Sequence, residues 1–270
     1  MPIDLIDIGA NLTHDSFDDD RDDVIRRASD AGVHRMVLTG SSEQGSRDAL
    51  ALAQLHPGRM YATAGVHPHH ASDYSDLVHS TLTELTSNEA SVAIGECGLD
   101  YFRNFSPQDH QRDAFRRQLE LAIETQLPVF LHQRDAHEDF VEILAPAMGK
   151  ITRAVAHCFT GGADELVAYL DLDLYIGITG WVCDERRGKN LKDIVAQIPL
   201  DRLMIETDAP YLLPRTLDPK PKTRRNEPMY LREVLRVVAE SMGCPESDVA
   251  AATTENAERF FAIQSQGEVI

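Results

Sequence analysis

The stretch PVFLHQRDA, residues 128–136, is a short apolar, β-rich run that ends in polar side chains. The segment before it places Phe115, Leu119 and Ile123 at the i, i+4, i+8 spacing of an amphipathic helix. A helix that leads directly into a strand is half of a βαβ unit, and right-handed βαβ units build parallel sheets. The fold class therefore depends on how often this unit recurs.

Apolar, β-rich runs occur eight times along the chain. They are Ile3–Ile8, Met36–Leu38, Met60–Ala64, Val92–Ile94, Pro128–Leu131, Ala154–Ala156, Leu174–Ile178 and Leu203–Ile205. Helical patterns separate them, and Gly32 fits the end of the first helix. Eight alternating units predict a (β/α)8 TIM barrel rather than an open sheet. Two helical segments follow, 229–241 and 248–261, and we expect the second to pack outside the barrel.

The composition fits one large intracellular domain. The chain has 270 residues, of which 43% are hydrophobic, and no linker or repeat interrupts it, so we expect a single domain over residues 1–270. The four cysteines form no Cys-x-x-Cys pair, which argues against a zinc knuckle or a redox motif. Reduced thiols, no signal-peptide pattern and no membrane-length apolar run favour a cytoplasmic location without a membrane partner. No obligate protein partner is evident.

The formal net charge of −18 repels nucleic acid and anionic membranes at long range. A phosphate-bearing substrate would therefore require local positive charge, from cations in the site or from basic loops beside it. The aspartate-rich segment Asp15–Asp23 is interpreted as a solvated helix start that suits the positive end of the helix dipole.

Histidine, glutamate and aspartate residues gather at the ends of the predicted strands, where barrels of this class carry their functional residues. They are His67 in GVHPHH, Glu96 in IGECGLDY, His132 in LHQRDA, His157 in HCFTGG, and Glu206 and Asp208 in ETDAPYL. Imidazoles and carboxylates in one pocket are typical of a divalent-metal site. A purely structural polar network is the alternative, but buried carboxylates require a partner.

Basic residues gather in the loops after the seventh and eighth strands, which in barrels often form a phosphate site. They are Arg186, Arg187, Lys189, Arg215, Lys220, Lys222, Arg224 and Arg225. Ordinary solvated loops would explain any one of them, whereas their clustering favours an anionic substrate, a phosphate ester. Trp181 and Tyr211 lie in the same loops, where stacking on a base and simple packing are about equally expected.

These motifs also carry a family resemblance. GVHPH, IGECGLDY, LHQRDA, HCFTG, ETDAPYL and RRNEP, in this order and spacing, resemble the TatD family of metal-dependent deoxyribonucleases, within the amidohydrolase-like barrels. GITGWVCDERRG and DIGANLT resemble the TatD subgroup itself. The resemblance covers nearly the whole chain. It implies a TIM barrel with one or two divalent cations, usually magnesium but also manganese or zinc, and 3′-to-5′ exonuclease action on single-stranded DNA and RNA.

The resemblance also implies roles for single residues. Glu96, His132 and His157 match metal ligands, with Glu96 as the bridging carboxylate where two ions bind. Asp208 matches the aspartate that binds metal or takes a proton, so Glu96 and Asp208 are the expected catalytic carboxylates. The residues expected to contact substrate are His67, Arg134, Trp181, Arg224 and Arg225.

The departure from the family pattern is at the first strand, where Gly9 and Asn11 stand in place of a His-x-His pair. An amide oxygen and water would suit magnesium better than zinc there. Two other functions remain open from the sequence. One is a metal-dependent hydrolase of a small amide or ester, since fold does not fix substrate. The other is a non-catalytic binding protein that has lost its metals.

Overall fold

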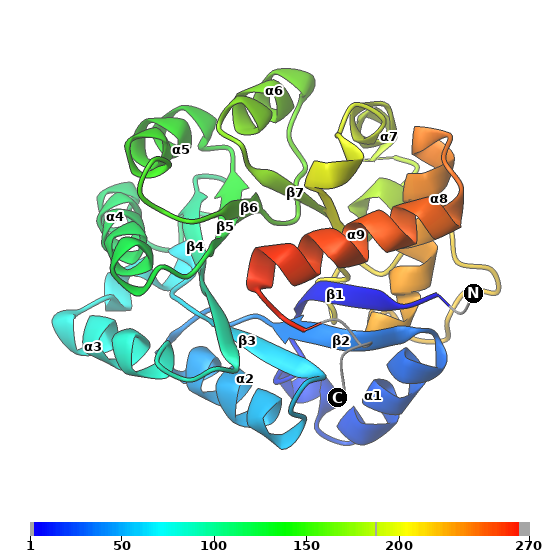
Figure 1. Ribbon diagram of the computed structural model, residues 1–270, viewed down its shortest axis with the longest axis horizontal. Helices are drawn as coiled ribbons and strands as arrows, with labels where there is room; N and C mark the ends of the chain where they lie inside the picture. Colours follow the sequence, from blue (N-terminus) through cyan, green and yellow to red (C-terminus); the bar gives the residue numbers. More distant parts are fainter. Residues whose placement is uncertain (1–2, 187, 265–270) are drawn as a thin grey trace. The chain divides into compact units, whose positions relative to one another are not determined.

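The computed structural model describes residues 3–186 and 188–264, in which strands and helices alternate along the chain (Figure 1). The strands are β1 Leu5–Ala10, β2 Val33–Leu38, β3 Met60–Ala64, β4 Ser91–Asp100, β5 Val129–Arg134, β6 Ala154–Ala156, β7 Tyr175–Ile178 and β8 Leu203–Ile205. The helices are α1 Arg21–Asp30, α2 Glu43–Leu55, α3 Asp76–Leu85, α4 Gln108–Thr125, α5 His137–Leu144, α6 Ala163–Asp171, α7 Lys189–Val195, α8 Leu231–Met242 and α9 Glu246–Phe261.

The eight strands follow one another in the sheet in chain order, from β1 to β8. A parallel bridge from Ala10 to Ala209 continues the hydrogen bonding from the residues after β8 to the end of β1. The predicted (β/α)8 class is confirmed, and every predicted apolar run overlaps a strand.

The largest difference between the predicted and observed strands is at β4. The apolar run ends at Ile94, but β4 continues to Asp100, so Glu96 lies inside the strand rather than after it. Gly95 (φ 130°) and Gly98 (φ 141°) interrupt the apolar pattern, although the chain remains in the sheet. Glycine in a strand interior often marks a bulge or a close backbone approach, and here it concealed the second half of the strand.

The chain divides into two compact units. One comprises residues 38–157 and 167–175, and contains β3 to β6 with helices α2 to α5. Its strands pair in parallel, with Ala64 opposite Ile94, Ile94 opposite Val129 and Leu131 opposite Ala156. Parallel pairing brings the carboxyl ends of these four strands to the same edge of the sheet. We call this part the β3–β6 unit.

The other unit contains β1, α1, nearly all of β2, β8 and helices α7 to α9, and we call it the β1–β8 unit. The predicted closing helix is α9. Its Asn256 side chain donates to the carbonyl oxygen of Leu203 (2.8 Å), and the hydroxyl of Thr254 donates to that of Asp4 (2.9 Å). The helix therefore packs where β1 and β8 begin. The expectation of a single domain over residues 1–270 stays a prediction. Among the described helices, none is long and apolar enough to cross a membrane.

Candidate metal centre

Two glycines bring β4 against β5 at the centre of the β3–β6 unit. A Cβ at Gly95 would collide with the carbonyl oxygen of Phe130, and one at Gly98 with that of His132. The pairing of β4 with β5 is correspondingly irregular between Ile94 and Cys97. Only residues without a side chain allow this approach, and it places the side chains of Glu96 and His132 in contact.

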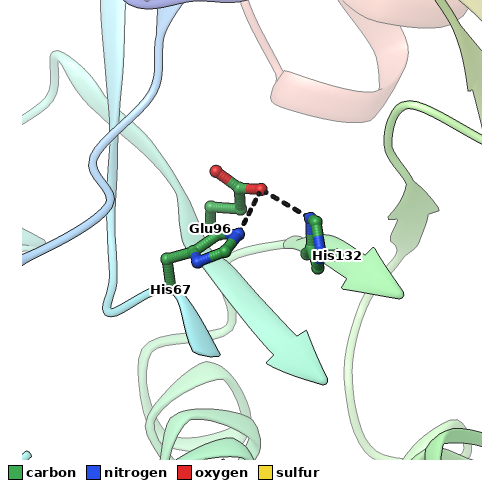
Figure 2. A group of neighbouring side chains, drawn as sticks. All are labelled: His67, Glu96 and His132. Carbon is green, nitrogen blue, oxygen red and sulfur yellow. Dashed lines mark hydrogen bonds and ion pairs between the residues drawn. The ribbon is translucent and has the colours of Figure 1, made fainter. Parts of the chain in front are cut away.

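Glu96 is the centre of the cluster, and Figure 2 shows the imidazoles of His67 and His132 beside its carboxylate. Its Oε1 atom lies 3.0 Å from Nδ1 of His132, 2.9 Å from Nε2 of His157 and 3.4 Å from Nε2 of His67. The four residues lie within or just after four neighbouring parallel strands: Glu96 and His132 inside β4 and β5, and His67 and His157 after β3 and β6. The structure therefore brings together four of the six polar residues predicted at the strand ends.

Electrostatics keep this buried carboxylate ionised. Burial alone would raise the pKa of Glu96, but His67, His157 and His132 around its oxygen hold that pKa well below 4.5. The glutamate is only 7% exposed, so its charge is compensated by these neighbours rather than by water. An ionised carboxylate among imidazoles is a donor set for a cation.

His67 has a fixed tautomer in this arrangement. Its Nδ1 atom accepts the backbone N–H of His69 at 3.0 Å, and burial lowers the pKa of His67 well below 6.5. A neutral ring that accepts at Nδ1 carries its proton on Nε2. The Nε2 atom of His67 faces Glu96, with 3.4 Å between Nε2 and Oε1.

Sequence reasoning missed Asp100, which is 1% exposed at the end of β4. Its Oδ2 atom lies 2.8 Å from Nε2 of His69 and 3.5 Å from Nε2 of His132, and its Oδ1 accepts the backbone N–H of Arg103 at 2.7 Å. Burial works against the charge, but these partners hold the pKa of Asp100 well below 3.8. The sequence pattern gave no signal for Asp100, because Gly95 and Gly98 interrupt the apolar run and conceal the second half of β4.

The residues present fit a divalent metal ion. One ligand atom each from His67, Glu96 and His132 lies within 4.8 Å of the others. Within the described chain, Nε2 of His132 is buried without a hydrogen-bond partner. Burial lowers the pKa of this ring, but the nearby carboxylates of Asp100 and Glu96 outweigh that effect and raise it. A buried ring nitrogen beside ionised carboxylates is the kind of group that metal binding satisfies.

The β1–β8 unit holds a second set of carboxylates. Asn11 donates its side-chain N–H to Oδ1 of Asp208 at 3.0 Å, and the N–H of Asp208 donates to the carbonyl oxygen of Gly9. Glu206 accepts the backbone N–H of Cys158 at 2.5 Å. The amide of Asn11 therefore orients the carboxylate of Asp208.

The predicted basic and aromatic loop residues differ in what surrounds them. Arg225 is engaged with Asp20 (2.7 and 2.8 Å) and Glu227 (2.8 Å), whereas Arg224 is exposed. The Asp15–Asp23 segment begins a helix as predicted, with Asp22 and Asp23 in the first turn of α1, but Asp20 is paired with Arg225, and this hydrogen bond lowers the pKa of Asp20 to about 2. The backbone N–H of Trp181 donates to Oγ1 of Thr179 at 3.3 Å.

Two further predicted basic residues have no structural account. Arg187 lies outside the described residues, as does the side chain of Lys189. Arg134, also predicted to contact substrate, ends β5 with its guanidinium carbon 3.9 Å from the ring centroid of Phe102.

A (β/α)8 fold with a carboxylate–imidazole cluster at its strand ends defines a metal-dependent hydrolase of the barrel type. The sequence profile of TatD related DNase matches residues 6–262. The chain belongs to this family, as the sequence motifs predicted. It is 52% identical over 257 residues to the 3′-5′ ssDNA/RNA exonuclease TatD of Erwinia tasmaniensis, which covers 95% of this chain and 99% of the relative. It is 51% identical to the protein of the same name from Pantoea sp., covering 96% of this chain and 100% of that one.

Solved structures agree with this assignment. A TatD homologue from Escherichia coli K12 has a TM-score of 0.88 and 28% identity, covering 98% of this chain and 100% of that one. A hydrolase of the TatD family from Entamoeba histolytica has a TM-score of 0.87 and 26% identity, with coverage of 98% and 100%.

Proposed function

We propose that this protein is a metal-dependent phosphodiesterase that removes nucleotides from the 3′ end of single-stranded DNA and RNA. The observation that carries the proposal is the Glu96 cluster, in which a buried, ionised carboxylate is surrounded by three imidazoles at the strand ends. The curated relatives at about half identity over nearly their full length are named for this activity, in agreement with the nuclease predicted from the sequence.

Glu96, His132 and His157 would hold the metal in this proposal. Nδ1 of His132 and Nε2 of His157 both lie within 3.0 Å of Oε1 of Glu96, and the far nitrogen of His132 lies 3.5 Å from Oδ2 of Asp100. A bound divalent ion polarises a phosphoryl oxygen and lowers the pKa of water. His67, with its proton on Nε2, would donate to a phosphate oxygen that displaces it from Glu96.

The role of Asp208 as proton acceptor or further ligand is carried over from the family motif and stays a prediction. Asn11 and the backbone of Gly9 fix the position of its carboxylate and of its peptide N–H. A positioned carboxylate is suited to orient or deprotonate a water molecule.

The identity of the metal is the finer part of the proposal. The family resemblance implies magnesium. Imidazole ligands suit zinc and other transition ions, whereas carboxylates and water suit magnesium and manganese. The nitrogens of His132 and His157 suit zinc, whereas the carboxylate of Glu96 suits magnesium, so the ligand types do not select one ion. Magnesium remains the prediction from the family.

The test is a time course on single-stranded DNA and RNA oligonucleotides labelled at either the 3′ or the 5′ end. Each is incubated with magnesium, manganese, zinc or a chelator. We expect the 5′-labelled strand to shorten in single-nucleotide steps and the 3′ label to be released at once as a mononucleotide, with no cleavage in chelator. Release from the 5′ end, or hydrolysis only in a parallel panel of amides and esters, would contradict the proposal.

A further inference from the structure

Two phenylalanines are exposed on one short loop of the β3–β6 unit. Phe102 is 52% exposed and Phe105 is 69% exposed, and both lie between the end of β4 and the start of α4. Single exposed apolar residues are common, but two large aromatic rings three residues apart at the functional end of a strand are a feature that favours a ligand.

The loop that carries these rings is held in a defined shape by polar contacts. The side chain of Gln111 is fully buried, accepts the N–H of Asp100 at 2.8 Å and donates to the carbonyl oxygen of Ser106 at 2.8 Å. The Ser106 hydroxyl donates to the carbonyl oxygen of His69 at 2.9 Å, and Asp100 holds the N–H of Arg103. The rings are thus presented to solvent by a rigid loop, which reduces the entropy lost when a ligand binds.

Positive charge lies beside the first ring. The guanidinium carbon of Arg134 is 3.9 Å from the centroid of Phe102, and that of Arg103 is 5.4 Å from the same centroid. In a chain with a net charge of −18, two guanidinium groups on one exposed aromatic ring form a local site for an anion next to a flat apolar surface.

The second ring connects this surface to the Glu96 cluster. Phe105 contacts the ring of His69 edge to face, with centroids 4.7 Å apart. His69 in turn contacts His67 with centroids 4.2 Å apart, and its Nε2 shares Asp100 with His132. One imidazole therefore separates Phe105 from the residues proposed to act on the phosphate.

We propose that Phe102 and Phe105, with Arg103 and Arg134, form a base-stacking platform for the nucleotides that adjoin the scissile phosphate. The rings would stack on unpaired bases, and the two guanidinium groups would pair with the phosphates between them. This inference rests on the proposed function for its choice of ligand. A platform of this kind binds bases of any sequence, because every base has a π-face, and it excludes a duplex whose bases are already stacked.

The test compares a fluorescein-labelled 15-nucleotide thymidine strand with a strand of the same length whose residues all lack a base. Binding is measured by fluorescence anisotropy in chelator, where the strand stays intact. Each of Phe102→Ala and Phe105→Ala should weaken binding of the normal strand by roughly five- to 100-fold, which is the range for loss of one base–aromatic stack. Neither substitution should change the weaker binding of the abasic strand. Phe105→Trp should restore binding of the normal strand.

The matched control is Leu55→Ala, which removes another exposed apolar side chain (74% exposed) from the same unit. Leu55 ends α2 just before β3 begins, so it lies at the opposite edge of the sheet from the strand ends, and binding should be unchanged. Equal losses on the normal and abasic strands, or unchanged binding in both alanine variants, would overturn the platform. So would failure of the wild-type chain to bind either strand.

The platform and the nuclease activity can fail separately. Cleavage of labelled strands with metal, combined with alanine variants that bind as tightly as wild type, would overturn the platform and leave the proposed function standing. Ring-dependent binding of the normal strand, combined with no cleavage under any metal, would support the platform and overturn the nuclease.

Discussion

Glu96 in β4 and Asp7 in β1 are two buried carboxylates with opposite behaviour. Glu96 is 7% exposed, and the surrounding imidazoles hold its pKa well below the ordinary value. Asp7 is fully buried, and its partners are the backbone N–H groups of Gly9 and Thr207 and the Thr207 hydroxyl. Burial raises the pKa of Asp7 to about 7, and these neutral donors offset the effect only in part.

The difference shows that burial alone does not make a carboxylate a metal ligand. Groups that can carry a positive charge keep Glu96 ionised and able to hold a cation, whereas neutral donors leave Asp7 close to a protonated state at neutral pH. Asp7 instead links β1 to Thr207, two residues after the end of β8. In the DIGANLT motif, Asp7 therefore has a structural role, whereas Asn11 contacts the predicted site residue Asp208.

The largest effect is expected from Glu96→Gln, which keeps the size of the side chain and removes the charge that distinguishes Glu96 from Asp7. We expect kcat/KM on a labelled single strand to fall at least about a thousandfold, since a Lewis-acid metal contributes several kcal/mol to the barrier. Glu89→Gln makes the same chemical change at an exposed position just before β4 and should have no effect. Near-normal hydrolysis by the Glu96 variant would remove this glutamate from the metal site.

Asp7→Asn tests the other half of the contrast through the pH dependence of stability. The pKa of Asp7 is above 3.8 in the folded chain, so the folded state binds more protons than the unfolded state between about pH 4 and pH 7. Asp7 therefore stabilises the fold least at high pH, and stability falls as pH rises through this range. Between pH 5 and pH 8 the wild-type chain should lose roughly 2–3 kcal/mol more of unfolding free energy than the variant.

The measurement is urea denaturation of both chains at several pH values. An asparagine at this position can still accept the two backbone N–H groups and donate to the Thr207 hydroxyl oxygen, so the variant is expected to fold. Asp30→Asn, at the exposed end of α1, is the control for the general loss of one negative charge. Parallel stability curves for wild type and Asp7→Asn would show that Asp7 is ionised in the folded chain.

The sequence predicted the parts of this structure that depend on local pattern. Each apolar run became a strand, and His67, Glu96, His132 and His157 came together because the carboxyl ends of parallel strands share an edge. What it missed depends on contacts that no local pattern contains.

The misses have separate physical causes. Asp100 was hidden because Gly95 and Gly98 concealed the continuation of β4, and the exposure of Phe102 and Phe105 depends on how Gln111 fixes their loop. Asp20 was taken for a solvated residue because one of its two arginine partners, Arg225, is 205 positions away in the chain.

Asp100→Asn should have the smallest effect of the three substitutions. It tests whether Asp100 supports the metal site, like Glu96, or has a structural role, like Asp7. One oxygen of Asp100 faces imidazoles, like Glu96, and the other accepts a backbone N–H, like Asp7. If its charge orients His132 for a metal, the metal dissociation constant should rise roughly 10- to 100-fold, as for other carboxylates that hold a ligating histidine. Activity should then recover as the metal concentration is raised.

Titration calorimetry with manganese or zinc gives the dissociation constant, and activity at saturating metal gives the second readout. Asp109→Asn, an exposed change in the first turn of α4, controls for the lost charge. Unchanged metal affinity with weaker binding of the thymidine strand would instead mean that Asp100 acts through the N–H of Arg103, as an anchor of the platform loop. In that case its role would resemble that of Asp7, and the charged set around the metal would be limited to Glu96 and its imidazoles.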